Sequence, residues 1–145
     1  DRVIVLENVQ DPGNVGTVLR TAAALGTELV VLLGDCADPY NPKTVRAAMG
    51  ALFRQRLWET DLSTLCAKLR EWELPLCGAA LRAESVDVKC VSLRRAAIAV
   101  GNEGRGLTDA LLEDHSPHDA RQRVAQRGGR GLHPYVGDVD TARII

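Results

Sequence analysis

The chain alternates apolar runs with segments of helical periodicity over about its first hundred residues. The continuous apolar runs at 28–33 and 96–100 are typical of strands that are buried on both faces of a sheet. Between them, apolar residues recur at helical spacing, as at 14–25. This alternation predicts an α/β fold in which a mostly parallel sheet is flanked by helices. Ligands of such sheets bind beyond the carboxyl ends of the strands, so the loops there are the expected place of a ligand site.

The expected elements follow from apolar runs, caps and turn residues. The expected strands are 2–7, 28–33, 56–59, 74–81 and 96–100. The expected helices are 14–25, 42–53, a segment running to about residue 72, and 108–113. The predicted boundary residues are Asn14 (N-cap), Gly26 (C-cap), Pro42 (first turn), Asp61 or Ser63 (N-cap) and Thr108 (N-cap).

Composition limits the kinds of core and partner. Hydrophobic residues make up 46% of the chain, enough for the core of one domain, but aromatics only 3%, so Val, Leu and Ala must build that core. The formal net charge of −1 means that a nucleic acid could be met only by a local basic patch. The sequence contains no run of ~18 apolar residues, the length that a membrane-spanning helix needs. The chain starts almost inside a strand and without Met, which suggests a domain of a longer protein.

The cysteines favour a reducing environment and no metal. No pair has CxxC spacing, and the three histidines lie far away in sequence, so a zinc site is not expected. The apolar or mixed surroundings of each cysteine are typical of reduced, buried thiols, and we therefore expect a cytoplasmic protein. The four residues are Cys36, Cys66, Cys77 and Cys90.

Two glycine-bearing turns follow predicted strands. DPGNVG comes after the first strand, and GNEGRG (101–106) comes directly after 96–100. Glycines at a strand end let the backbone approach a ligand, and Asn102 and Glu103 add an amide and a carboxylate there. GNEGRG is neither GxGxxG opening a helix nor a P-loop. Taken alone, it fits a ligand-binding loop and a tight, charged turn equally well.

Arg20 is the other unusual feature. It stands in a helix pattern that is otherwise nearly free of charge from residue 14 to residue 27. An ordinary solvent-facing arginine is one interpretation. If the helix is buried, however, a lone cation needs a partner or a role, and the guanidinium fork suits phosphate oxygens.

Taken together, these motifs resemble the SpoU (TrmH) family of RNA ribose 2′-O-methyltransferases, in the SPOUT superfamily. LENVQDPGNVGTVLRTAAALG resembles its motif 1, and AIAVGNEGRGLTDALLE resembles its motif 2. NPKTVRAAMGALFRQRL is similar to the segment between them, although Ala48 and Met49 depart from the usual Lys-x-x-Arg-Ala-Ser-x-Gly-Ala. The resemblance runs from about residue 2 to residue 113.

The resemblance implies a SPOUT-type fold with a C-terminal trefoil knot, a homodimer, S-adenosylmethionine as cofactor, and methyl transfer to a ribose 2′-hydroxyl of rRNA or tRNA. It implies catalytic roles for Arg20, Asn14 and Glu103. It implies cofactor contacts for Gly101, Asn102, Gly104 and Leu81.

The chemistry narrows the role of Arg20. An arginine does not accept a proton at neutral pH, because its pKa exceeds ~12. We therefore expect Arg20 to bind phosphate and to lower the pKa of the hydroxyl electrostatically, while alignment of hydroxyl and methyl group supplies much of the rate. No metal is required.

The C-terminal segment departs from the family. We divide the chain into a catalytic core, 1–114, and a divergent segment, 115–145, that stands where motif 3 and the knot belong. This segment lacks the usual Ser-Leu-Asn, and its QRVAQRGGRG fits a solvated tail or an RNA-binding arginine-glycine segment. Two alternatives follow: an inactive SPOUT-like module that binds RNA or dimerises, and, less favoured by the motif order, a generic nucleotide-binding domain.

Overall fold

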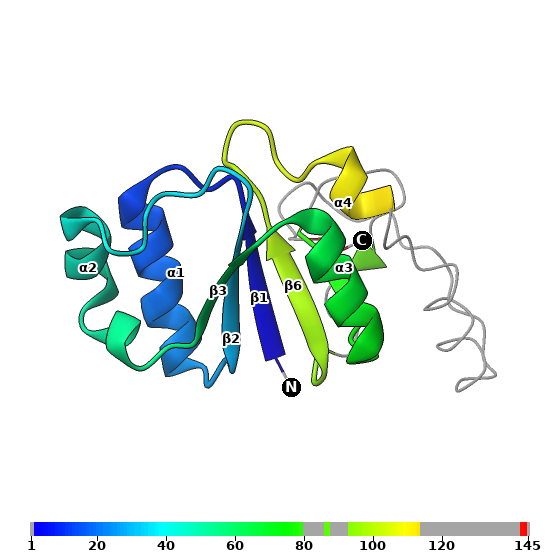
Figure 1. Ribbon diagram of the computed structural model, residues 1–145, viewed down its shortest axis with the longest axis horizontal. Helices are drawn as coiled ribbons and strands as arrows, with labels where there is room; N and C mark the ends of the chain where they lie inside the picture. Colours follow the sequence, from blue (N-terminus) through cyan, green and yellow to red (C-terminus); the bar gives the residue numbers. More distant parts are fainter. Residues whose placement is uncertain (1, 80–85, 88–92, 114–142, 145) are drawn as a thin grey trace.

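The central sheet has five parallel strands in the order β3-β2-β1-β6-β4, with helices on both faces (Figure 1). The computed structural model describes residues 2–79, 86–87, 93–113 and 143–144. The strands of this sheet are β1 (Arg2–Glu7), β2 (Leu29–Leu33), β3 (Leu57–Thr60), β4 (Leu76–Gly78) and β6 (Ala96–Val100). The helices are α1 (Pro12–Ala24), α2 (Pro42–Ala48), the 3₁₀ helix η1 (Ala51–Phe53), α3 (Leu62–Glu71) and α4 (Asp109–Glu113). The predicted fold class, a mostly parallel α/β sheet between helices, is confirmed.

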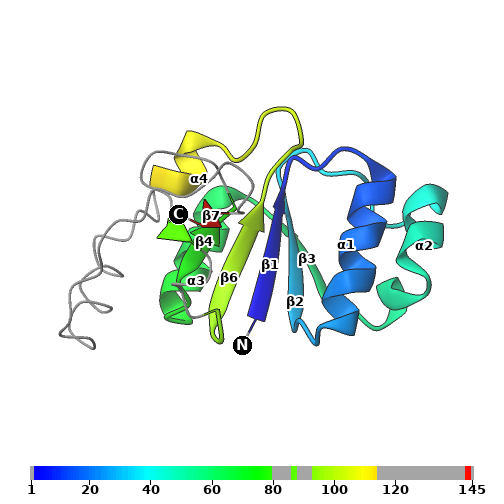
Figure 2. The ribbon, with the colours of Figure 1, turned by 180° about the vertical axis from the view of Figure 1, so that it is seen from behind.

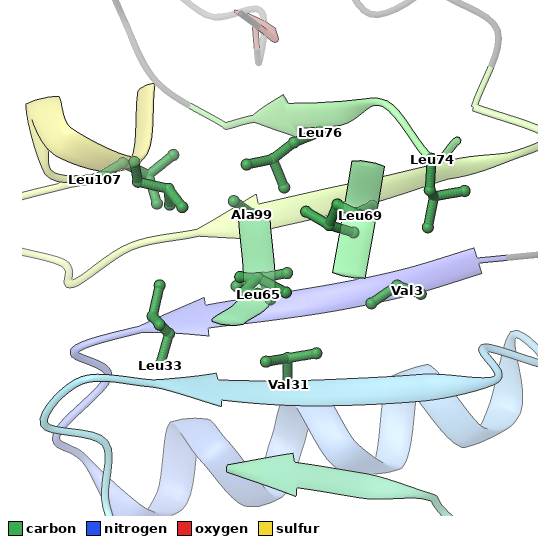
Figure 3. Close-up of a cluster of buried hydrophobic side chains, with 12 residues drawn as sticks. Val3, Val31, Leu33, Leu65, Leu69, Leu74, Leu76, Ala99 and Leu107 are labelled. Atoms are coloured by element: carbon green, nitrogen blue, oxygen red, sulfur yellow. The ribbon is translucent and has the colours of Figure 1, made fainter. Parts of the chain in front are cut away.

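The two faces of the sheet form separate apolar layers. Val3 and Val5 of β1 belong to a buried cluster with α3 and α4, which Figure 3 shows in close-up. Leu6, next along the strand, belongs to the cluster that α1 and α2 cover. This alternation follows from the two-residue period of a strand. Both layers consist mainly of Val, Leu and Ala, as the composition predicts.

Helix α1 packs against α2 at very short range through Gly16. A Cβ added to Gly16 would lie 2.5 Å from the Thr44 carbonyl oxygen and 2.6 Å from the Ala47 Cβ. Both atoms belong to helical backbone or to its first side-chain atom, so they cannot rotate away. The contact places α2 as an outer layer beyond α1, at the edge of the molecule (Figure 1).

Most predicted boundaries hold, and the exceptions have local causes. Gly26 ends α1 as predicted: its φ is +68°, and the Thr27 N–H bonds the Ala22 carbonyl oxygen at 2.9 Å. Of the two candidate caps of α3, Asp61 is the one that accepts from the Thr64 N–H, at 2.9 Å. The predicted helix 42–53 is interrupted, because Met49 and Gly50 both have positive φ, and it resumes as η1.

The described residues also include a short ladder that the sequence did not predict. Strand β5 (Val86–Asp87) pairs antiparallel with β7 (Arg143–Ile144). The predicted knot and the division at residue 114 concern mainly 114–142, which lie outside the described residues, so both stay predictions. No helix in the part of the chain that the structure describes is long and apolar enough to cross a membrane.

Substitution of Gly16 tests the helix contact. Gly16→Ala should lower the free energy of unfolding by about 1–2 kcal/mol, because overpacking strain of about 2–3 kcal/mol outweighs a helix-propensity gain of roughly 1 kcal/mol. Denaturant unfolding measures this difference. Thr21→Ala, an exposed change on the same helix, is the control and should be neutral or slightly stabilising. A Gly16→Ala protein as stable as the wild type would contradict the close contact.

Candidate functional site

The motif 1 and motif 2 loops leave neighbouring strands at the same edge of the sheet. Strands β1 and β6 are parallel neighbours, with Leu6 opposite Val100. The loops that follow them lie together at the upper end of the sheet in Figure 1 and again in the reverse view of Figure 2. Between β1 and β6 the strand order changes direction, since the chain runs outward from β1 to β2 and β3 and later returns on its other side. Ligands of open α/β sheets bind at such a point.

Among the hydrogen bonds between the two motifs, one joins two residues that are expected to be catalytic. The Asn14 side-chain amide, in the first turn of α1, donates to a carboxylate oxygen of Glu103 in the motif 2 loop. These residues are 89 positions apart in the chain. The pair puts an oriented amide and a carboxylate at the carboxyl edge of the sheet, where Glu103 is exposed. Two of the three residues expected to be catalytic are thus in contact.

The Asn14 side chain is available because Asp11 caps the helix. The sequence-based assignment of Asn14 as the N-cap is wrong: α1 begins at Pro12, and the Asp11 carboxylate accepts from the Asn14 backbone N–H at 2.9 Å. Lys43 of α2 donates to the same carboxylate at 2.7 Å. This side-chain hydrogen bond and, next, the backbone N–H of Asn14 lower the pKa of Asp11.

Asn102 organises the motif 2 loop from within. Its Oδ1 accepts from the backbone N–H groups of Gly104, at 2.8 Å, and Arg105, at 3.3 Å. Its Nδ2 donates to the Asn8 carbonyl oxygen at 3.1 Å, which fastens the loop to the end of β1. The Asn102 carbonyl also accepts from the Gly106 N–H at 2.7 Å. The amide therefore holds the loop in shape, a positioning function that the sequence alone did not indicate.

Glu7 clamps the far end of the same loop. This glutamate is the last residue of β1 and is only 4% exposed. Its two carboxylate oxygens accept hydrogen bonds from Thr108, one from the backbone N–H at 2.8 Å and one from the hydroxyl at 2.6 Å. Thr108 Oγ1 in turn accepts from the Leu111 N–H at 3.4 Å, so the predicted cap of α4 is confirmed. Sequence reasoning missed Glu7, although a carboxylate closing a buried apolar run signals that donors must be found for it.

The comparisons with known proteins show the family of the chain. The model of the family described as SpoU rRNA methylase matches residues 1–126. The chain belongs to that family. It is similar to the 23S rRNA (guanosine(2553)-2'-O)-methyltransferase RlmP of Bacillus subtilis, with 38% identity over 112 residues, 77% of this chain and 45% of that protein. It thus spans less than half the length of this curated relative.

Two solved structures share the fold. The rRNA methyltransferase from Sinorhizobium meliloti has a TM-score of 0.72 and 30% identity, over 79% of this chain and 44% of that one. The SpoU methyltransferase AviRb from Streptomyces viridochromogenes, in complex with the cofactor AdoMet, has a TM-score of 0.65 and 26% identity, over 77% and 44%. The parallel α/β architecture is therefore that of SpoU structures.

The glycines of motif 2 divide into packed and open positions. A Cβ on Gly101 would overlap the Gly106 carbonyl group, so the loop's own closure already requires a glycine there. A Cβ on Gly104 would meet only the Asn102 Oδ1, at 3.5 Å, and one on Gly106 would meet nothing within 4 Å. The open positions leave the backbone accessible at the end of β6. A nucleoside-type cofactor can approach there, so these residues fit the group that the family implies.

Arg20 lies apart from the pair. It is exposed on α1, and its side chain makes no hydrogen bond or ion pair with the described residues, which agrees with the solvent-facing interpretation and not with a buried cation. It comes six positions after Asn14, which is about 9 Å along the helix axis. Leu81, expected to contact the cofactor, lies outside the described residues.

A pocket of about 280 Å³ lies beside this site, at the carboxyl ends of β2 and β3. Gly34, Cys36, Asp38 and Glu59 are among the residues that line it. Its two carboxylates would repel phosphate, and it belongs to strands on the other side of β1 from the motif 2 loop. We therefore keep the candidate site at the loops that follow β1 and β6.

Removal of the Thr108 hydroxyl tests the clamp. Thr108→Val keeps the side-chain shape but leaves one oxygen of a buried carboxylate without its donor, which should lower the free energy of unfolding by about 1–3 kcal/mol. Thr108→Ser keeps the hydroxyl and is the matched control, expected to stay close to wild type. Denaturant unfolding compares the three proteins. A loss of stability in Thr108→Ser but not in Thr108→Val would show that the methyl group, not the hydroxyl, matters.

The lowered pKa of Asp11 predicts a pH dependence of stability. Asp11→Asn keeps a capping oxygen but loses the charge that faces Lys43. Because the folded pKa lies below the unfolded value of 3.8, the wild-type advantage should be full above about pH 4 and should disappear as the pH falls through the folded pKa. Unfolding free energies of both proteins along a pH series measure it. A difference that stays constant with pH would contradict the ion pair.

Proposed function

We propose that this chain forms the core of an enzyme that transfers a methyl group from S-adenosylmethionine to a ribose 2′-hydroxyl of rRNA or tRNA. The single observation that carries the proposal is the hydrogen bond between Asn14 and Glu103, which unites motif 1 and motif 2 at the point where the strand order reverses. Membership of the SpoU family and the printed activity of RlmP support it. AviRb, which binds AdoMet, supports the cofactor.

The residues of this site suit that reaction. Bound S-adenosylmethionine supplies a methyl group that its sulfonium already activates. Glu103, oriented by Asn14, presents an acceptor for a ribose hydroxyl at the sheet edge. Arg20 has an exposed guanidinium, suited to holding a phosphate next to that hydroxyl and favouring its deprotonation.

Several parts of the proposal rest on the family and not on the contacts described above. We expect Gly101, Asn102, Gly104 and Leu81 to form the cofactor side of the site, with Asn102 acting through the loop that it holds. We also propose that a C-terminal trefoil knot completes this side, that the active protein is a homodimer, and that it works in the cytoplasm. An inactive module that binds RNA or dimerises is the second candidate. It is favoured by the lack of a Ser-Leu-Asn motif after residue 114 in the sequence.

Arg20→Ala separates binding from chemistry. We expect methyl transfer to bulk rRNA or tRNA to fall by about 100-fold or more, because a charge that stabilises the developing oxyanion is lost. Calorimetric titration should show S-adenosylmethionine binding unchanged. Arg94→Gln, an exposed arginine just before β6, is the control and should keep full activity.

The same titration on the wild-type chain decides between the two candidates. Saturable one-site binding supports the methyltransferase. No binding by folded protein would favour the inactive module instead. Full activity in Arg20→Ala would contradict the role of Arg20 without touching the cofactor assignment.

A further inference from the structure

The outer layer of the molecule carries an exposed surface that the site described above does not use. It consists of α2, η1 and the residues at their ends, from Tyr40 to Arg56, which we call the α2–η1 surface. Its large apolar side chains are unusually bare: Phe53 is 80% exposed, Met49 72% and Tyr40 69%. They account for three of the five large hydrophobic residues that are exposed in the described part of the chain.

All the charged side chains of the same surface are positive. Residues 40–56 contain four cations and no carboxylate, in a chain whose formal net charge is −1. All four cations are exposed: Lys43, Arg46, Arg54 and Arg56. Lys43 pairs with Asp11, whereas the guanidinium groups of the three arginines make no hydrogen bond or ion pair with the described residues. Their guanidinium groups are thus available to an external anion.

Helix packing fixes which residues face outward. Thr44, Ala48 and Leu52 are buried towards α1, and Gly16 locks the two helices together. Arg46 and Met49 lie between these buried positions in the chain, Phe53 follows the last of them, and all three are exposed. The packing of α2 and η1 against α1 therefore keeps the aromatic side chains and the guanidinium groups exposed on the same outer layer.

The surface is continuous with the candidate site. Lys43, in the first turn of α2, bonds Asp11, the cap of α1, and Asn14 follows in the first turn of that helix. A chain of phosphates that passes the Asn14–Glu103 pair can therefore continue over Lys43 and along α2. The length of α2 adds about 10 Å to such a path.

We infer that the α2–η1 surface binds unpaired nucleotides of the RNA that flank the methylated one. Exposed aromatics are platforms on which unpaired bases stack, and interspersed arginines hold the backbone. The inference rests on the proposed function, because it takes RNA as the substrate. A second copy of the chain is a poorer occupant, since a two-fold contact would bring this unpaired positive charge against itself.

Affinity for RNA measures the stacking contribution. The probes are a short RNA hairpin with an unpaired loop and a fully paired RNA of the same stem sequence. We expect Phe53→Ala and Phe53→Leu each to weaken hairpin binding about tenfold, and Phe53→Trp to retain it. Binding of the paired RNA should change little in all three variants.

Salt dependence measures the phosphate contacts. Arg46→Gln and Arg54→Gln should each reduce the slope of log affinity against log salt by about 0.7–0.9. Arg94→Gln, an exposed arginine outside the surface, should leave both affinity and slope unchanged. Sedimentation and S-adenosylmethionine titration of every variant complete the set, and both should match the wild type.

The outcomes are separable. Unchanged hairpin affinity and slope in the Phe53 and arginine variants would overturn the inference and leave the proposed function intact. Altered self-association would overturn it in favour of a protein interface. Failure of the wild-type chain to bind S-adenosylmethionine would count against the proposed function, whatever the RNA measurements show.

Discussion

The pairing of β1 with β6 is the constraint on which the site depends. These strands come from opposite ends of the described core, yet they align from Arg2 opposite Ala96 to Leu6 opposite Val100. This register brings the motif 1 and motif 2 loops to one edge and lets Glu7 and Asn8 reach the motif 2 loop. A shift of one residue would move Val3 and Val5 to the layer of Leu6 and Leu6 to theirs, so the packing of the core also fixes the geometry of the polar site.

The polar residues of that edge divide their work between shaping and presenting. The side chains of Glu7, Asn102 and Asp11 accept hydrogen bonds from backbone N–H groups, which would otherwise lack partners. Because Asp11 takes the capping role, Asn14 is released to meet Glu103. The loops that carry the Asn14–Glu103 pair are thus held by the hydrogen bonds of Glu7, Asn102 and Asp11. Such support keeps the side chains of a site in one geometry.

Much of the fold could be predicted from the sequence, because its signals are local. Buried apolar runs gave the strands, and Gly26, Asp61 and Thr108 ended or capped helices as their chemistry suggests. The break at Met49 was missed because a non-glycine residue with positive φ has no sequence signal of its own. The ladder of β5 and β7 was missed because two-residue strands carry no periodicity.

The candidate site was harder to predict than the fold. The motifs identified Asn14 and Glu103, but only the strand order could show that they touch, since nothing local connects residues 89 positions apart. The same reason hid the Glu7 clamp. Asn14 was misassigned as a cap because Asp11, three residues earlier, competes for the same role and precedes a proline, the favoured first helical residue.

The place of β1 in the sheet also bears on how the protein is made. Among the strands of this sheet β1 is synthesised before the others, and it can pair with β2 as soon as that strand is made, but its other edge must wait until β6 has been translated. Until then that edge presents unpaired N–H and C=O groups, a template for unwanted strands. The loops that form the site also meet only when this long-range contact closes, which costs more loop entropy than a local one. The paired motifs therefore form only after β6 and the loop that follows it have been made, so a nascent chain that ends earlier has neither the Glu7–Thr108 clamp nor the Asn14–Glu103 contact.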